Sequence, residues 1–105
     1  MNYSEYAQVF KALSDETRLK IVEMLSCGEM CACDLLAYFQ ITQPTLSYHM
    51  KNLTECGLVN SKKDGSWIKY SINIEKANLI STVWEKITTT HDDCICKCDG
   101  KKDCV

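Results

Sequence analysis

CACDLLAYFQITQPTLSYHM, residues 31–50, is the stretch on which the fold of this 105-residue chain depends. Two cysteines two positions apart open it, and the apolar run that follows predicts a short helix over residues 32–39. After a polar turn, Thr42 is placed to cap a second helix whose first turn holds Pro44, where a missing N–H costs nothing. Two short helices joined by a tight turn are typical of a helix-turn-helix.

The second of these helices has one apolar and one polar face. Leu46, Met50 and Leu53 follow the helical period and should point inward, and Gly57 is expected to end the helix. The outer face offers side chains that can reach base edges or phosphates: Gln43, Thr45, Ser47, Tyr48, His49 and Lys51. Any one of them could be ordinary solvated surface. As a set on one helix they favour a DNA contact.

A β-hairpin is expected next. Residues 58–63 and 66–72 flank Asp64-Gly65, a strong hairpin signal between alternating runs. The inward positions of the second run are expected to be Ile68, Tyr70 and Ile72, with Trp67 covering the hairpin. The hairpin would be the wing of a winged helix-turn-helix, and three of its lysines suit phosphate oxygens: Lys62, Lys63 and Lys69.

Three further helices complete the prediction of a mostly α protein with a small β-hairpin. The first carries an apolar stripe at Tyr6, Val9, Phe10 and Leu13. Ser14 is expected to cap the second, which buries Leu19, Val22 and Leu25 and stops at Gly28. The last runs over residues 74–90. Its apolar positions are too many for one small domain to cover, so with the first helix they should form a homodimer seam: Ala77, Ile80, Val83, Trp84 and Ile87.

Length and composition fit one domain, residues 1–90, followed by a flexible cysteine-rich tail, residues 91–105. No stretch approaches the ~18 consecutive apolar residues of a membrane span, and the N-terminus lacks a signal peptide, so we expect a cytoplasmic protein that contacts no membrane. The net charge is −2, yet four lysines against two acids give residues 41–70 a balance of +2, next to the expected DNA face. No nucleophile–base pair or phosphate loop is present, which argues against an enzyme.

The eight cysteines are clustered, and in a reducing compartment clustering favours metal binding or redox chemistry over disulfides. Spacing alone leaves Cys31 and Cys33 evenly divided between soft-metal ligands and packed apolar residues. Residues i and i+2 do not share a helix face, so binding one ion with both would distort the first turn of the helix. The tail holds Cys94, Cys96, Cys98 and Cys104, whose spacing does not match a zinc knuckle. Cys27 and Cys56 are expected to be structural.

Taken together, the chain resembles the ArsR/SmtB family of metal-sensing repressors. The resemblance rests on ALSDETRLKIVEML, the CACDLL box at 31–36, QPTLSYHMKNL at 43–53 and the KKDG wing at 62–65. It implies a homodimer that binds palindromic operator DNA, represses its own operon and releases DNA when trivalent arsenic or antimony binds cysteine thiolates.

One departure from the family pattern concerns the ligands. Many arsenic-sensing members have a third cysteine where this chain has Leu36, so the tail would supply the missing sulfur, with Cys96 and Cys98 the first choices and Cys94 another. Cd(II) or Pb(II) is an alternative inducer at the same box. A thiol redox regulator and a thiolate metal buffer are further alternatives.

Overall fold

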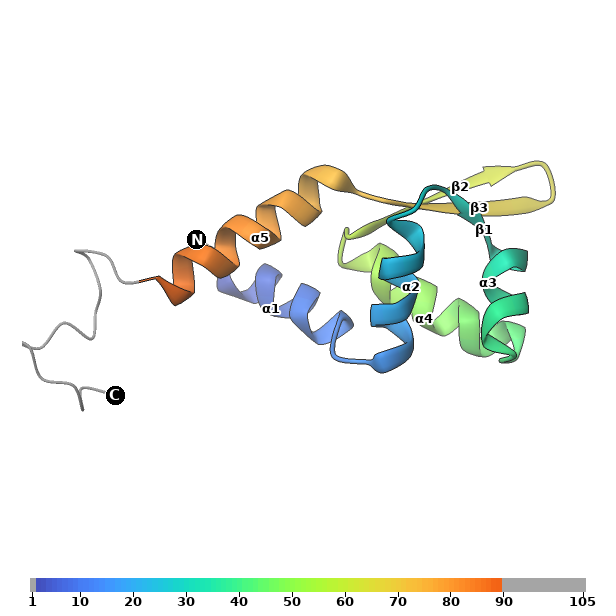
Figure 1. Ribbon diagram of the computed structural model, residues 1–105, viewed down its shortest axis with the longest axis horizontal. Coiled ribbons are helices and arrows are strands. Elements are labelled where there is room, and N and C mark those ends of the chain that lie inside the picture. Colours follow the sequence, from blue (N-terminus) through green and yellow to red (C-terminus); the bar gives the residue numbers. More distant parts are fainter. Residues whose placement is uncertain (1, 90–105) are drawn as a thin grey trace, which may run out of the picture.

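The computed structural model of this chain describes residues 2–89, which form a mostly helical domain with a small antiparallel sheet (Figure 1). Its elements in chain order are α1 (Tyr3–Ala12), α2 (Glu16–Leu25), β1 (Met30–Cys31), α3 (Ala32–Phe39), α4 (Gln43–Glu55), β2 (Val59–Asp64), β3 (Trp67–Ile72) and α5 (Ile74–Thr88). The predicted helix-turn-helix is α3–α4, and the wing is the β2–β3 hairpin. Within residues 2–89 no helix combines the length and apolar character needed to cross a bilayer.

Side-chain caps set where the helices begin. Thr42 accepts a hydrogen bond from the backbone N–H of Thr45 and starts α4, as predicted. Asp15, not Ser14, caps α2 by accepting from the N–H of Arg18 at 3.0 Å. The prediction for Ser14 is wrong because its hydroxyl instead donates to the carbonyl of Lys11, which closes the end of α1.

The core lies where α1, α2, α3 and α4 meet beneath the sheet. Val9, Ile21, Leu35, Met50 and Leu53 are the largest fully buried side chains. Leu19, expected inside, is 54% exposed. The buried stripe of α2 is set by Ile21 and Leu25, one helical turn apart, and Leu19 lies about 200° around the helix from Ile21.

The sheet has the strand order β1-β3-β2, and β1 is an element that the sequence pattern did not predict. The hairpin turn falls at Gly65-Ser66, one residue later than expected, because Asp64 still pairs with Trp67 and Gly65 adopts a φ of +64°. Tyr70 is buried, whereas Ile68 is 42% and Trp67 56% exposed. Both were expected to pack, but Ile68 lines only an open groove against α4, and Trp67, the preceding residue of the strand, projects to the other face of the sheet.

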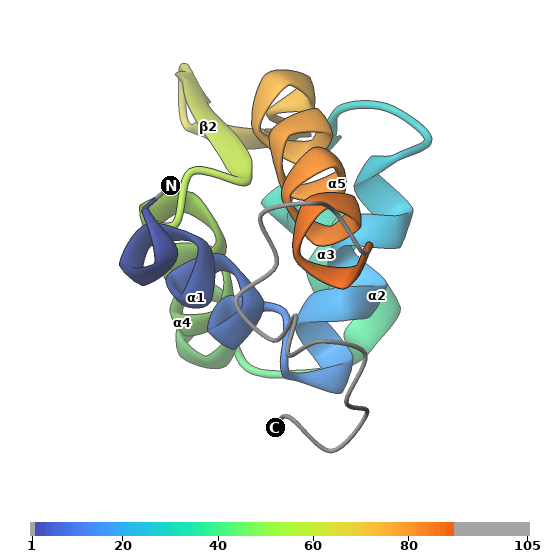
Figure 2. The same ribbon diagram turned by 90° about the vertical axis from the view of Figure 1, so that its left-hand side faces the viewer.

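Helices α1 and α5 lie side by side at the end of the domain away from the wing (Figures 1 and 2). The Lys76 ammonium is 2.6 Å from the Glu5 carboxylate, and the ring centres of Phe10 and Trp84 are 6.0 Å apart in an edge-on arrangement. Helix α5 buries Ile80 and Val83 but leaves Trp84 58% and Ile87 46% exposed in this single chain. It ends at Thr88, two residues earlier than predicted.

Candidate nucleic-acid interface and thiol site

All but one of the residues predicted for the polar outer face of α4 are exposed there. Gln43, Thr45, Ser47, Tyr48 and Lys51 are exposed, whereas Leu46, Met50 and Leu53 face the core. Pro44 sits in the first turn, where it costs no hydrogen bond. The helix therefore presents hydroxyl, amide and ammonium groups outward from a firmly buried opposite face.

His49 departs from this pattern, because its side chain turns inward and is only 12% exposed. Its Nδ1 lies 3.0 Å from an Arg18 guanidinium nitrogen and 3.8 Å from an Asp15 carboxylate oxygen. An arginine cannot accept a hydrogen bond, so in this contact the guanidinium donates and Nδ1 accepts. The expectation that His49 lies on the outer face is wrong; the ring ties α4 to α2.

Arg18 is the residue that sequence analysis missed here. Its Nε donates to the carbonyl of Ala12 at the end of α1, and its guanidinium carbon lies 6.0 Å from the centre of the Tyr48 ring. One side chain of α2 thus contacts the end of α1 and two consecutive residues of α4. Nothing in the local sequence signals this contact, because it depends on how α2 and α4 cross.

The register of the wing places its three lysines on two different faces. Paired residues of antiparallel strands project to the same side. Lys63 pairs with Ile68, and Lys62 pairs with Lys69 on the opposite face. The Ile68 side borders a surface groove against α4, which we call the wing groove, lined by Ser47, Met50, Lys51, Thr54, Ser61, Ile68 and Tyr70. Lys63 therefore neighbours the recognition face, while Lys62 and Lys69 lie on the outer face of the sheet.

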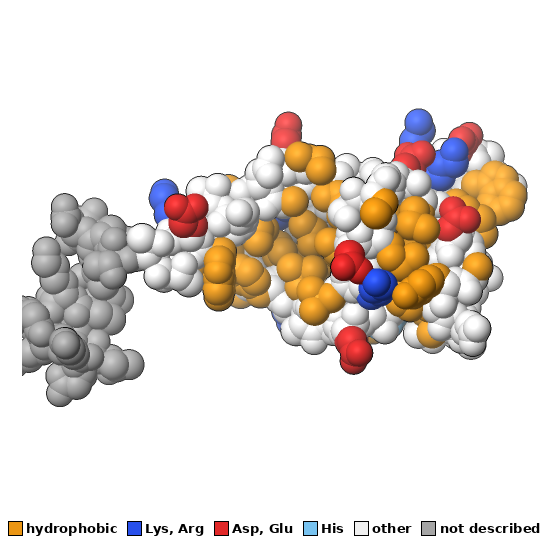
Figure 3. Space-filling model, in the orientation of Figure 1, with side chains coloured by type: hydrophobic (Ala, Val, Ile, Leu, Met, Phe, Trp, Pro, Cys, Tyr) orange, Lys and Arg blue, Asp and Glu red, His pale blue; other side chains and the backbone are white. Residues whose placement is uncertain are grey.

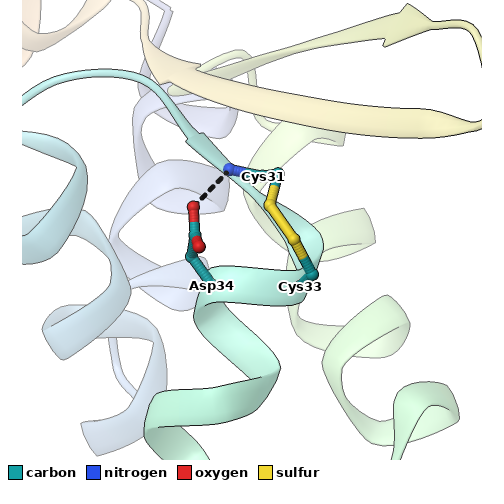
Figure 4. Close-up of side chains that lie close together, drawn as sticks. All are labelled: Cys31, Cys33 and Asp34. Atoms are coloured by element: carbon teal, nitrogen blue, oxygen red, sulfur yellow. Dashed lines mark hydrogen bonds between the residues drawn. A yellow bond between two sulfur atoms is a disulfide. The ribbon is translucent and has the colours of Figure 1, made fainter.

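Cys31 and Cys33, the thiol pair, meet at the start of α3 (Figure 4). Their sulfur atoms are joined in a disulfide, with Cα atoms 5.3 Å apart. The Asp34 carboxylate accepts a hydrogen bond from the Cys31 backbone N–H at 3.3 Å, and the sulfur and carboxylate atoms of the three residues lie within 4.8 Å of one another. This is a compact set of two soft donors and one hard donor.

The expected distortion of α3 is not needed to bring the two sulfur atoms together. Cys31 is not helical: it belongs to β1 and is the N-cap of α3, with φ −84° and ψ 159°. The rule that i and i+2 point to different helix faces therefore does not apply to this pair. Leu36, at the position of the third cysteine in many family members, is half-buried in α3.

The remaining cysteines divide into two groups. Cys56 is buried and donates to the Leu53 carbonyl, as expected of a structural thiol, whereas Cys27 is exposed, so the prediction that it packs is wrong. Cys27 lies in the turn after α2 and not in the helix. The predicted tail ligands Cys94, Cys96 and Cys98 lie outside the described residues, as does Cys104.

A helix-turn-helix with a buried inner face, a polar outer face and an adjoining hairpin defines a winged helix-turn-helix DNA-binding protein. A solved structure of this kind, from Mycobacterium bovis, is described as a homodimeric winged helix-turn-helix DNA-binding domain and a possible ArsR-family transcriptional regulator. It matches with a TM-score of 0.68 and 25% identity, over 85% of this chain and 88% of that one.

The sequence comparisons identify the family. Residues 15–61 match the family described as bacterial regulatory protein, arsR family. The arsenical resistance operon repressor of Staphylococcus aureus is 45% identical over 99% of this chain and 100% of its own length. That of Staphylococcus xylosus is 46% identical over 92% and 93%. This chain belongs to the ArsR family, and it is a DNA-binding transcriptional regulator, not an enzyme.

Proposed function

We propose that this chain is an arsenical resistance operon repressor that releases its operator when As(III) or Sb(III) binds the thiol pair. The observation that carries the proposal is the convergence of the Cys31 and Cys33 sulfur atoms at the first residue of the helix-turn-helix. Thiolates select soft acceptors, and the pair must be reduced before it can ligate one. The near full-length similarity to staphylococcal repressors of that name supports the same inducer.

Operator recognition is assigned to α4 and the wing. Gln43, Thr45 and Ser47 are placed to reach base edges in the major groove, and Tyr48 and Lys51 to reach phosphates. Lys63, paired with Ile68 on the side of the sheet that faces the wing groove, would follow the same DNA backbone, with Lys62 and Lys69 on the other face. His49 supports the helix from within instead of reading DNA.

The regulator would act as a homodimer on a palindromic operator. Apolar side chains gather over α1 and α5 on one face of the domain (Figure 3). Exposed hydrophobic side chains on these two helices include Tyr3 of α1 (67% exposed) and Trp84 (58%) and Ile87 (46%) of α5. This is a large apolar area to remain in contact with water. Burying this face against a second copy would bring two α4 helices to successive major grooves, with half-sites about one helical turn (~10 bp) or a multiple apart.

The identity of the third group that binds the metal, beside Cys31 and Cys33, would separate As(III) or Sb(III) from Cd(II) or Pb(II) as the inducer. As(III) prefers three thiolates, which assigns the third sulfur to the tail, with Cys96 and Cys98 ahead of Cys94. The Asp34 carboxylate beside the thiol pair is a specific observation that favours a second candidate, Cd(II) or Pb(II), because these ions also accept oxygen donors.

The deciding experiment is fluorescence anisotropy of labelled promoter DNA with the reduced full-length protein. Arsenite is titrated first, then Cd(II), Pb(II) and Zn(II), and the series is repeated with a chain ending at residue 91. Release by arsenite from the full-length protein alone assigns the third sulfur to the tail. Release by Cd(II) or Pb(II) with no response to arsenite would overturn the arsenic assignment and leave the repressor intact.

A further inference from the structure

The thiol pair and the wing are connected through one sheet. β1 pairs with β3, the returning strand of the wing, with Cys31 opposite Lys69 and Met30 opposite Tyr70. β3 lies between β1 and β2, so it is the central strand of the sheet (Figure 1). A displacement of β1 therefore acts directly on the strand that carries the wing.

The register also fixes which side of the sheet a bound ligand would occupy. Cys31, Lys69 and Lys62 are directly paired across the three strands and form a row on the outer face. Tyr70 and Ile68 project to the other face, where they line the wing groove against α4. By this register Cys31 and Lys69 are direct neighbours across the two strands, and the Cys31 sulfur reaches from there to Cys33 at the start of α3 (Figure 4).

Lys69 spans the distance from this position to the end of the wing. Its ammonium lies 3.5 Å from the Asp64 carboxylate, and its side chain is 39% exposed. Asp64 is the last residue of β2 and pairs with Trp67 beside the turn. The backbone of Lys69 thus pairs with Cys31, while its ammonium group contacts Asp64 near the tip of the wing.

We propose that ligand binding at the thiol pair releases DNA through the wing, with Lys69 as the positioning residue that links Cys31 to the wing tip. This inference rests on the proposed function. Side chains that face each other across antiparallel strands have Cβ atoms about 4.5–5.5 Å apart. An arsenic atom bonded to Cys31, with its further ligand, must displace the Lys69 side chain or shift β1 along β3. Either change breaks the Lys69–Asp64 contact and turns the wing relative to α4.

A rival route runs through the helix-turn-helix itself. Cys33 lies in the first turn of α3, and the buried Leu35 packs α3 into the core shared with α4. On that route a ligand tilts α3, α4 follows, and the wing keeps its position. The two routes therefore differ in which element responds when the thiol pair is occupied.

Fluorine NMR of full-length protein labelled with 5-fluorotryptophan separates them. Trp67 lies on the wing and Trp84 on α5, so each resonance reports one region. The ligand is phenylarsine oxide, which forms two As–S bonds to a dithiol with loss of one water and no change in arsenic oxidation state. We expect the Trp67 resonance to shift on binding, and the shift to disappear in the Cys31→Ser/Cys33→Ser variant. An unshifted Trp67 in wild-type protein that carries arsenic by mass spectrometry would overturn the proposal, as would the same shift in the serine variant.

A matched pair of substitutions tests Lys69. For the wild type, Lys69→Ala and Lys62→Ala, the Kd for promoter DNA is measured with and without arsenite, and the ratio is taken within each protein so that basal affinity cancels. We expect Lys69→Ala to reduce this ratio roughly fivefold or more and Lys62→Ala to keep it, since couplings between sites typically span 5- to 150-fold. A wild-type ratio in Lys69→Ala would overturn the role of Lys69. A ratio of one in the wild type would overturn the proposed function, and the Trp67 resonance would then decide the link to the wing by itself.

Discussion

At the scale of single residues, the Arg18–His49 contact is the one that most directly fixes the orientation of the recognition helix α4. Arg18 donates to the Ala12 carbonyl and to His49 Nδ1, which joins the end of α1 to the recognition helix. A hydrogen bond from a charged group contributes about 1.5–3 kcal/mol, more than a typical neutral one. The orientation of α4 therefore depends on one arginine of α2, which contacts α4 at both His49 and Tyr48.

Arg18→Lys is expected to weaken operator binding, because an ammonium keeps the charge but cannot hold both acceptors in the fork geometry of a guanidinium. A loss of about 1–2 kcal/mol corresponds to roughly 5- to 30-fold in Kd, measured by anisotropy on protein shown to be folded by circular dichroism. The matched control is Lys20→Gln on the same helix, which removes an exposed pair with Glu23 and a contact with the Tyr38 ring of α3. Equal affinity for Arg18→Lys and Lys20→Gln would contradict this role.

The thiol pair gives a second prediction at this scale, on the effect of oxidation. With Cys31 and Cys33 joined in a disulfide, the caps of α3 and α4 and the outer face of α4 are all intact. The oxidised protein should therefore bind promoter DNA as tightly as the reduced protein, yet stay bound when arsenite is added until a reductant restores two thiols. Anisotropy checks this, with the 31–33 disulfide verified by peptide mass spectrometry. Release of DNA on oxidation alone would instead support the redox-regulator alternative.

At the scale of elements, the wing register makes the lysines unequal. Lys63 pairs with Ile68, which lines the wing groove together with Lys51 of α4, whereas Lys62 lies on the other face of the sheet. Each phosphate that a lysine neutralises contributes about 0.9 to the slope of log K against log salt. Lys63→Gln should therefore lower the slope by about that amount and Lys62→Gln should leave it unchanged, in anisotropy titrations over a range of salt concentrations. The reverse result would mean that the outer face of the wing meets the DNA.

The helices and strands also show which parts of the fold could be predicted from the sequence. The bounds of the helix at residues 32–39 and the Thr42 cap were predictable, because the apolar period and the cap chemistry are local. β1 was not, since a two-residue strand has no period and its partner β3 is distant in the chain. Without β1, the rule for two residues of one helix was applied to Cys31, which the structure places before the helix as its N-cap. The predicted outward position of His49 was wrong for a similar reason. Its ring turns inward to contact Arg18 of α2, and that contact depends on how the two helices cross.

At the scale of the whole molecule, the apolar face over α1 and α5 decides whether the chain can read two half-sites. Trp84 stands on this face at 58% exposure, with its ring against Phe10. Leu19, on α2, is exposed to a similar degree, 54%, and lines a different groove between α2 and α3. The two residues therefore form a matched pair: both are large exposed hydrophobic side chains, and only Trp84 lies on the expected dimer face.

Trp84→Glu should convert the homodimer to a monomer, because a charge in place of a central aromatic removes a contact worth about 2 kcal/mol or more and leaves an unpaired carboxylate in the interface. Operator affinity should fall with it, since one α4 then contacts one half-site without its partner. Leu19→Glu should keep the dimer and its affinity. Sedimentation equilibrium over a range of protein concentrations measures the first effect, and anisotropy on the same samples measures the second. A dimeric Trp84→Glu, or a monomeric Leu19→Glu, would move the interface away from α1 and α5 and with it the half-site spacing inferred from that face.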